Sequence, residues 1–258
     1  MSRETAALRE TALALAEVAD GLAMARFGGP VAATAKPDGS PVTAADREIE
    51  AALRAELARA HPDHAVLGEE EGGALDAEAP TWVIDPIDAT KNYLRGVPVF
   101  ATLIAVVVDG RAVVGVASAP ALGERWDAAE GLGARRNGTR VGVSAIAEVA
   151  EAHLCHGGLT WFRDEPGAWA RLGGLVDTAW RTRGFGDFWM HLLVAGGMAE
   201  AAFERDLSVW DLAALLPIVT EAGGTVSAFD GGDPLSGDGS LLSSNGRLHE
   251  TVRRALVG

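Results

Sequence analysis

Apolar residues at helical spacing dominate the start of the chain. Leucines and valines within residues 2–25 recur at nearly helical intervals, which predicts a long amphipathic helix. The segment 36–43 is rich in proline, glycine and serine and predicts a turn-rich loop. A second helix is expected to follow, with Asp46 near its start and His61–Pro62 at its end.

The hydrophobic period then changes to one typical of strands. Short apolar runs at 65–67 and 82–85 predict buried strands, and a longer run at 101–108 leads into the turn formers Asp109–Gly110. An Asp-Gly pair between two apolar runs favours a β-hairpin. We therefore expect residues 1–140 to combine helices with a mainly antiparallel sheet.

The second half of the chain, residues 141–258, alternates between short apolar runs and helical patterns. Strands are predicted at 153–156, 179–183, 200–203 and 225–229, and helices at 167–175, 188–195, 211–222 and 249–257. Such alternation is typical of an α/β unit with a partly parallel sheet. With 258 residues, the chain is expected to form a single domain, residues 1–258, in which the two halves are subdomains.

Composition and charge narrow the class of protein. Hydrophobic residues make up 48% and charged residues 22% of the sequence, which is typical of a folded globular protein. The net charge of −14 would repel nucleic acid and anionic membrane surfaces, so we expect neither as a partner. Charges near the N-terminus and the lack of a long apolar run predict no signal peptide and no membrane span. A single cysteine, Cys155, permits no internal disulfide, and we expect a cytoplasmic protein.

An apolar strand leads directly into two aspartates. Asp85 and Asp88 flank a proline turn, and the carbonyl of Ile87 lies between them in the sequence. Carboxylate and carbonyl oxygens are the donors that Mg²⁺ or Mn²⁺ prefers. A short helix is expected to begin at Ala89, and the free N–H groups at a helix start can bind phosphate.

Two further segments carry candidate carboxylates. Asp211 stands at the start of a strongly apolar predicted helix, and it can complete a second metal site if that helix points at Asp85 and Asp88. Glu69 follows a predicted strand and the turn residue Gly68. Any one of these aspartates alone is more often a helix cap than a ligand, so the prediction rests on their combination.

Taken together, the three segments resemble the inositol-monophosphatase-like phosphatase superfamily. They read LGEEEGG at 67–73, DPIDATKNY at 85–93 and WDLAALLPIVTEAGG at 210–224, in the order and spacing of that family. The resemblance implies a layered α-β-α-β-α sandwich of the sugar-phosphatase type, in the α+β or α/β class, and a homodimer. It also implies Mg²⁺-dependent hydrolysis of a small phosphorylated metabolite, by in-line attack of water between two metals.

The resemblance further implies roles for single residues. The implied metal ligands are Glu69, Asp85, Ile87, Asp88, Asp211 and Asp46. Glu69, Asp85 and Thr90 are the implied catalytic residues, because Glu69 and Thr90 would orient the attacking water. Asp46 matches an acidic position that supports a third, weaker metal, so two or three Mg²⁺ per subunit are expected, with Mn²⁺ as a substitute.

One position departs from the family motif, which has a glycine where this chain has Ala89. If the backbone there requires a positive φ, the methyl group would cost on the order of 1 kcal/mol and tilt the phosphate cradle. If φ is helical, alanine is harmless. Because Ala89 begins a predicted helix, we expect the harmless case.

The predicted leaving-group side carries two more carboxylates. Asp187 and Glu204 match positions that face the leaving group, and a pair of carboxylates there favours a cationic alcohol over a neutral polyol. An aromatic residue, Phe188, could stack on a ring. The segments 91–105 and 181–189 resemble the histidinol-phosphatase branch of the superfamily, which implies histidinol phosphate as the substrate.

Alternatives remain open at this point. Asp187 is also a candidate N-cap for the helix that follows it. The same site could belong to an inositol-1-monophosphatase or another small sugar or nucleotide phosphatase, or to a non-catalytic metal- or phosphate-binding regulator. Arg183 and Lys36 are expected to lend positive charge. The expected substrate-binding residues are Ala89, Thr90, Asp187, Phe188, Glu204, Asp211, Arg183 and Lys36.

Overall fold

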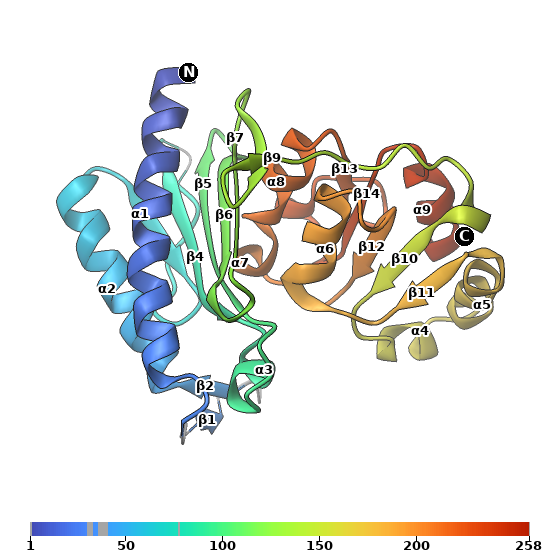
Figure 1. Ribbon diagram of the computed structural model, residues 1–258, viewed down its shortest axis with the longest axis horizontal. Coiled ribbons are helices and arrows are strands. Elements are labelled where there is room, and N and C mark those ends of the chain that lie inside the picture. Colours follow the sequence, from blue (N-terminus) through green and yellow to red (C-terminus); the bar gives the residue numbers. More distant parts are fainter. Residues whose placement is uncertain (1, 30–32, 36–40, 77, 258) are drawn as a thin grey trace.

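Helices α1 (Ser2–Arg26) and α2 (Ala44–Ala60) lie side by side on one face of a large β-sheet (Figure 1). The computed structural model describes residues 2–29, 33–35, 41–76 and 78–257. Helix α1 packs closely on the sheet because small residues line its buried face. These residues are Ala12, Ala16, Ala19 and Ala23. Both helices predicted from the sequence pattern are confirmed.

In the described part of the chain, seven strands form this sheet in the order β3-β4-β5-β6-β7-β8-β9. The strands are β3 Ala65–Gly68, β4 Thr81–Asp88, β5 Ala101–Val108, β6 Arg111–Ala119, β7 Glu124–Ala129, β8 Gly133–Arg136 and β9 Thr139–Arg140. Strands β3 and β4 are parallel, and each later neighbouring pair is antiparallel. Strands β7 to β9 were not predicted, because charged residues such as Arg125 and Arg135 interrupt their apolar pattern.

Five strands among the described residues form a second sheet, in the order β11-β10-β12-β14-β13. The strands are β10 His153–His156, β11 Arg181–Arg183, β12 Ala201–Glu204, β13 Thr225–Ser227 and β14 Leu241–Ser244. Strand β10 is parallel to β11 and β12, whereas β14 is antiparallel to β12 and β13. The sheet is therefore partly parallel, as the alternating pattern predicted.

Further helices separate the two sheets or cover the outer face of the second one (Figure 1). Between the sheets lie α6 (Asp187–Ala195), α7 (Val209–Leu212) and α8 (Leu215–Glu221). The outer face carries α4 (Thr160–Asp164), α5 (Ala168–Thr178) and α9 (His249–Val257). The layers run α-β-α-β-α, which confirms the predicted sandwich.

Short elements complete the described structure. Helix α3 (Thr90–Leu94) follows β4, and 3₁₀ turns cover Pro120–Leu122, Val149–Glu151 and Pro234–Ser236. Strand β1 (Ala33–Ala35) pairs antiparallel with β2 (Pro41–Thr43).

Two predictions of local structure were wrong. The segment 36–43 was predicted as a loop, but its last three residues form β2, while residues 36–40 lie outside the described residues. Pro41 is tolerated there because it is the first residue of its strand. The helix predicted at 211–222 is divided into α7 and α8, because Pro217 has no N–H to donate to the carbonyl of Ala213.

A glycine in β6 brings the junction of α7 and α8 against the sheet. An ideal Cβ atom on Gly115 would lie 2.1 Å from the carbonyl oxygen of Ala214, so a larger residue does not fit. Asp211 precedes Ala214 by three residues, and α7 packs on β4 and β5. This close approach therefore positions Asp211 near the end of β4.

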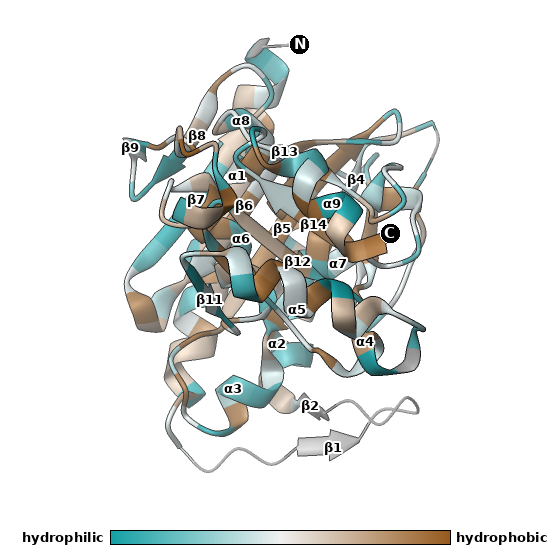
Figure 2. Ribbon diagram, turned by 90° about the vertical axis from the view of Figure 1, so that its right-hand side faces the viewer, coloured by the Kyte–Doolittle hydropathy of each residue, from teal (hydrophilic) through white to brown (hydrophobic). Residues whose placement is uncertain are grey.

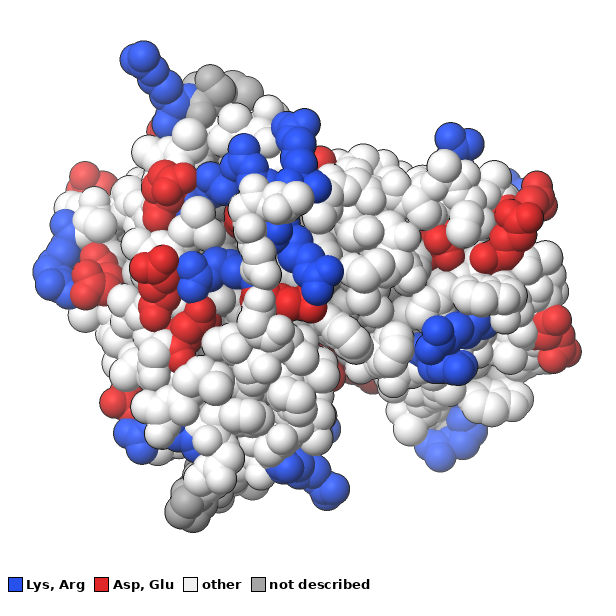
Figure 3. Space-filling view, viewed as in Figure 1, with Lys and Arg blue, Asp and Glu red and all other residues white. Residues whose placement is uncertain are grey.

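Charged side chains of both signs lie on the surface. Figure 2 shows hydrophobic colouring along β5 and β6 and hydrophilic colouring on α2 and α3. Acidic and basic side chains are interspersed over the α1 half of the face drawn in Figure 3. Among the described residues, no helix combines the length and the hydropathy that a membrane crossing requires.

Candidate active site

Three aspartates from two distant segments converge at the end of β4. Asp85 and Asp88 belong to β4 itself, and Asp211 lies in the first turn of α7. One carboxylate oxygen from each residue lies within 4.8 Å of the others. Asp85 is 1% exposed and Asp88 is 9% exposed. The structure thus brings together three of the predicted metal ligands.

An irregularity in β4 makes this convergence possible. In a regular strand, side chains three positions apart point to opposite faces of the sheet. The register of β4 with β5 shifts between Asp85 and Asp88, where Pro86 cannot donate a ladder hydrogen bond. The hydroxyl of Thr102 donates to the carbonyl oxygen of Pro86 at 2.7 Å and holds the irregular backbone. Asp85 and Asp88 can therefore contribute to one site.

Asp211 is fixed by the start of its own helix. The backbone N–H of Ser208 donates to Oδ2 of Asp211 at 2.6 Å, in a capping box at the start of α7. A carboxylate has two oxygens, so the cap interpretation and the ligand interpretation of Asp211 are compatible.

Glu69 lies next to Asp85, and Asp46 lies close to Glu69. Glu69 follows β3, and its N–H donates to the carbonyl oxygen of Ile84 at 3.2 Å, beside Asp85 in the sequence. Asp46 lies in the first turn of α2, where its Oδ2 accepts the N–H of Thr43 at 2.8 Å. Burial raises the pKa of Asp46, and the negative charge of Glu69 adds to that effect. Five predicted ligands are therefore gathered at one place.

Burial and mutual repulsion act together on the carboxylates at this place. Burial, and then the charges of Glu69, Asp88 and Asp211, hold the pKa of Asp85 well above its usual range. Burial also raises the pKa of Asp211 to about 7. Among the described residues, no lysine or arginine forms an ion pair with the three aspartates, and Oδ1 of Asp85 is buried without a hydrogen-bond partner. An all-oxygen donor set with surplus negative charge fits a hard divalent cation.

Thr90 and Ile87 contact each other directly. The hydroxyl of Thr90 donates to the carbonyl oxygen of Ile87 at 3.0 Å, across the turn between β4 and α3. The bond directs the lone pairs of the Thr90 oxygen away from that carbonyl. The hydroxyl is therefore available as an acceptor for a water molecule, as the predicted role requires.

The expectation for Ala89 was wrong. Ala89 is the N-cap of α3 and has φ of 64° and ψ of 46°, which is the left-handed conformation. An L-residue with a Cβ is strained there, typically by about 1–2 kcal/mol. The sequence indicated a helix start, but an N-cap residue lies outside the helix and need not share its φ.

We expect Ala89→Gly to raise the free energy of unfolding by about 0.5–1 kcal/mol. Relief of the strained φ is partly offset by the larger conformational freedom of glycine in the unfolded chain. Urea denaturation measures the change. Ala51→Gly, at an exposed position in the middle of α2, is the matched control and should lower stability by about 1 kcal/mol. A destabilised Ala89→Gly protein would show that the methyl group makes a favourable contact.

A cavity of about 300 Å³ extends from the aspartates toward α6 and β12. Asp88 and Asp211 line one side, and Asp187 and Glu204 line it as well. Phe188 also borders this cavity but is 1% exposed and belongs to the hydrophobic core. Its backbone N–H donates to Oδ2 of Asp88 at 3.0 Å. The metal side and the predicted leaving-group side thus share one cavity.

Asp187 is held in an unusual backbone conformation. It is the first residue of α6 and has φ of 51°, while Gly186 is the N-cap. The alternative that Asp187 is the N-cap is therefore wrong. Burial raises the pKa of Asp187, and the nearby positive charge of Lys91 opposes that effect.

Glu204 lies against Asp187 at the end of β12. Its Oε2 accepts the backbone N–H of Asp187 at 3.1 Å. Burial, and then the charge of Asp187, raise the pKa of Glu204 to about 7. An ideal Cβ on Gly157 would lie 2.0 Å from the Glu204 carboxylate, so the absence of a side chain at Gly157 makes room for it. Two acidic groups therefore lie next to each other in the cavity.

Arg183, a predicted substrate-binding residue, is not brought to the site. Arg183 is exposed on β11 and donates to the carbonyl oxygen of its neighbour Thr182 at 2.7 Å. It is not among the described residues that line the cavity. Lys36 lies outside the described residues.

Two basic residue types that line the cavity, a histidine and an arginine, were not predicted as site residues. His191 is 1% exposed, its Nδ1 lies 2.8 Å from the hydroxyl oxygen of Ser243, and burial lowers its pKa to about 3. It follows Asp187 by four residues on one helix, and this spacing was an available signal. Arg205 forms an ion pair with Asp238 at 2.8 Å, and no sequence pattern indicated its position.

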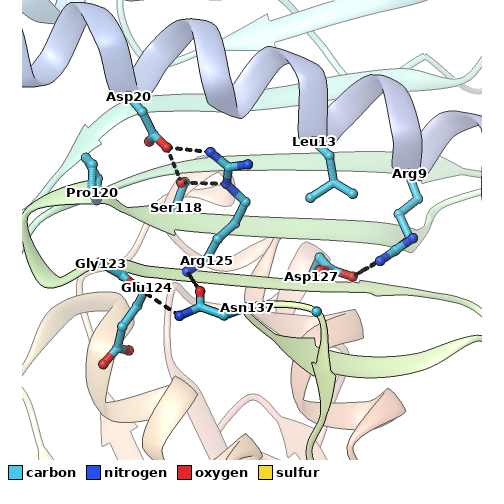
Figure 4. A pocket seen from close by; sticks show the side chains of 11 residues that line it. Arg9, Leu13, Asp20, Ser118, Pro120, Gly123, Glu124, Arg125, Asp127 and Asn137 are labelled. Carbon is cyan, nitrogen blue, oxygen red and sulfur yellow. Dashed lines mark hydrogen bonds and ion pairs between the residues drawn. The ribbon is translucent and has the colours of Figure 1, made fainter.

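A second cavity, of about 490 Å³, lies between α1 and the strands β6 to β8 (Figure 4). Oppositely charged side chains pair across it. Arg9 lies 2.6 Å from Asp127, and Arg125 lies 2.6 Å from Asp20, which also accepts the hydroxyl of Ser118 at 2.9 Å. None of the described residues around this cavity is a predicted site residue. These ion pairs connect α1 to the sheet.

The chain belongs to the inositol monophosphatase family, whose model matches residues 4–257. It is 48% identical to a histidinol-phosphatase of Mycobacterium tuberculosis, over 93% of this chain and 94% of that protein. It is 43% identical to a histidinol-phosphatase of Streptomyces coelicolor, over 92% of each chain. Among solved structures, an IMPase of Thermotoga maritima superposes with a TM-score of 0.87 at 29% identity, covering 99% of this chain and 97% of that one.

Proposed function

We propose that this protein is a magnesium-dependent histidinol-phosphatase, which converts histidinol phosphate and water to histidinol and phosphate. The observation that carries the proposal is the shared cavity, in which buried aspartates on one side meet Asp187 and Glu204 on the other. The 48% identity to a histidinol-phosphatase along most of both chains supports the same substrate.

The charges of the cavity match the two ends of this substrate. Its phosphate would lie at the cations held by Asp85, Asp88 and Asp211. Its amine and imidazole would lie toward Asp187 and Glu204, which are acceptors for their N–H groups. The leaving group of a neutral polyol phosphate would offer these two half-buried carboxylates no cation to pair with.

The donor set supports two or three Mg²⁺ ions per subunit. Asp85, Asp88 and Asp211 would hold one ion, and Asp46 would support the third. A further ion would be held by Glu69, the Ile87 carbonyl and Asp85, which is shared between the two ions. Thr90 would contribute to this ion by holding its water. When bound, Mg²⁺ supplies neutralisation of the carboxylates, a lower pKa for water and stabilisation of charge on the transferred phosphoryl group.

The chain's own residues would orient the attacking water. The Thr90 hydroxyl donates its hydrogen bond to the Ile87 carbonyl oxygen, so the hydroxyl oxygen would accept a hydrogen bond from the water. Glu69 follows the end of β3, next to Asp85, and can accept a proton from the same water. With the water held by two acceptors, one oxygen lone pair is free to attack phosphorus in line.

A metal-depletion experiment tests the proposal. Protein stripped with EDTA should release no phosphate from histidinol phosphate, and added Mg²⁺ should restore release. The same protein with Ca²⁺ is a control, because a larger and more flexibly coordinated ion is a poor substitute. Failure to release phosphate from any monoester with Mg²⁺ or Mn²⁺ would favour the non-catalytic regulator.

The family resemblance also supports a homodimer, which light scattering in solution measures.

A further inference from the structure

A buried carboxylate outside the proposed chemistry lies beneath the turn that carries Glu69. Helix α2 presents Asp46, Glu50 and Arg54 at four-residue spacing, so the three share one face of the helix. The side chain of Glu50 is 0% exposed. A buried carboxylate is costly unless its oxygens are hydrogen-bonded, so its contacts indicate why it is there.

Glu50 binds the backbone of the residues that directly follow Glu69. Its Oε2 accepts the N–H of Glu70 at 2.7 Å, and its Oε1 accepts the N–H of Glu71 at 3.0 Å. Arg54 donates from Nε to Oε1 of Glu50 at 2.9 Å and so balances the charge. The carboxylate is therefore satisfied on both oxygens by the turn and by its own helix.

Arg54 contacts the residue at the end of the same turn. Its Nη2 donates to the carbonyl oxygen of Gly72 at 2.6 Å. The backbone of Gly72 also closes the turn by exchanging hydrogen bonds with Gly68 at 3.0 and 3.1 Å. Two side chains of α2 are thus hydrogen-bonded to the backbone of the turn at residues 70, 71 and 72.

Gly68 is required by space and not by backbone conformation. Its φ is outside the left-handed region, yet an ideal Cβ would lie 2.1 Å from Oε1 of Glu50 and 2.3 Å from its carboxyl carbon. Any side chain at position 68 would displace the Glu50 carboxylate. The turn glycine and the buried glutamate therefore fit each other.

We propose that Glu50 is a positioning residue for the metal site. By fixing the N–H groups of Glu70 and Glu71, it fixes the backbone just after Glu69 and so holds the Glu69 carboxylate next to Asp85. This inference rests on the proposed metal-dependent function. Glu50 itself touches neither the substrate nor the metals, so it acts only through Glu69.

Glu50→Gln tests the proposal. The amide keeps one acceptor oxygen but places an NH₂ group either against the N–H of Glu70 or against both the N–H of Glu71 and Arg54, so at least one anchoring bond is lost. Replacing a residue that supports a metal ligand typically lowers metal affinity or activity by about 10–100-fold. We expect kcat to fall and the Mg²⁺ concentration for half-activation to rise within that range, while KM for the phosphate ester changes by less than about threefold. Calorimetric titration with Mg²⁺ alone should show the same loss of affinity without turnover.

Glu221→Gln is the matched control. Glu221 also accepts two backbone N–H groups of a turn, from Gly131 at 2.9 Å and Gly133 at 2.7 Å, but this turn joins β7 to β8. We expect its Mg²⁺ dependence to equal that of the wild type. If Glu50→Gln does not fold, as judged by circular dichroism, Glu50→Asp keeps the charge for Arg54 and replaces it in every assay.

The outcomes separate this inference from the proposed function. A wild-type protein without Mg²⁺-dependent hydrolysis would refute the proposed function. A folded Glu50 variant with wild-type Mg²⁺ affinity and kcat, beside an active wild type, would overturn the positioning role alone. The positioning role is also overturned if the variants at positions 50 and 221 lose only thermal stability and to a similar extent.

Discussion

Asp85→Asn is expected to lower kcat for Mg²⁺-dependent phosphate release by roughly 1000-fold. Asp85 is a proposed ligand for two ions, and an amide carries no charge to hold a divalent cation. Losing about 4 kcal/mol of metal-derived stabilisation of the transition state corresponds to this factor. Steady-state kinetics with saturating Mg²⁺ measures it, and loss of less than about tenfold would exclude Asp85 as a shared ligand.

The same substitution should stabilise the metal-free protein. Burial, and then the charges of Glu69, Asp88 and Asp211, hold the pKa of Asp85 well above its usual range. A neutral side chain of the same shape removes one of the repelling charges. We expect the free energy of unfolding in EDTA to rise by about 1 kcal/mol, in line with the usual trade-off between function and stability.

Asp127→Asn provides the contrasting control. Asp127 is also buried, but it pairs with Arg9 at 2.6 Å and lies outside the candidate site. Its replacement should lower stability, because a partly buried arginine loses its partner, and should leave kcat within about twofold of the wild type. If the two variants show the same changes in kcat and stability, Asp85 has no functional role that a buried aspartate outside the site lacks.

Asp187→Asn should change substrate preference. Asparagine has nearly the same size and also tolerates the left-handed φ of 51°, so the substitution removes mainly the charge. A hydrogen bond to a charged group contributes about 1.5–3 kcal/mol, which corresponds to about 10–150-fold. We expect kcat/KM for histidinol phosphate to fall within that range.

Inositol 1-phosphate is the control substrate for this variant, because its leaving group is neutral. Its kcat/KM should stay within about threefold of the wild-type value. An equal loss on both substrates would mean that Asp187 acts on the metal site or on folding, and not on the leaving group. Burial raises the pKa of Asp187, and the positive charge of Lys91 opposes that rise and so favours the ionised carboxylate that the substitution removes.

The sequence predicted those site residues that belong to contiguous sequence motifs. Asp85 and Asp88 belong to one segment, which lies between a predicted strand and a predicted helix. Asp211 belongs to another segment, at the start of a predicted helix. Their convergence depends on features that no periodicity reveals. These are the irregular register of β4 at Pro86 and the missing side chain of Gly115, which admits the α7–α8 junction.

Other features depended on conformation and tertiary contacts. The left-handed φ of Ala89 follows from a turn between strand and helix, and local propensity did not indicate it. Glu50 reads as an ordinary helical residue, and only its bonds to the turn of residues 70 and 71 distinguish it. Strands β7 to β9 are stabilised by pairing with their neighbours, although their own pattern is broken by charges.

The ratio of kcat/KM for histidinol phosphate to that for inositol 1-phosphate, measured with Mg²⁺ under identical conditions, tests the central claim most directly. Because Asp187 and Glu204 line the cavity and would place two acidic groups beside the leaving group, we expect a ratio well above one, on the order of tenfold or more. A ratio below one would contradict it and would assign the site to a neutral polyol phosphate.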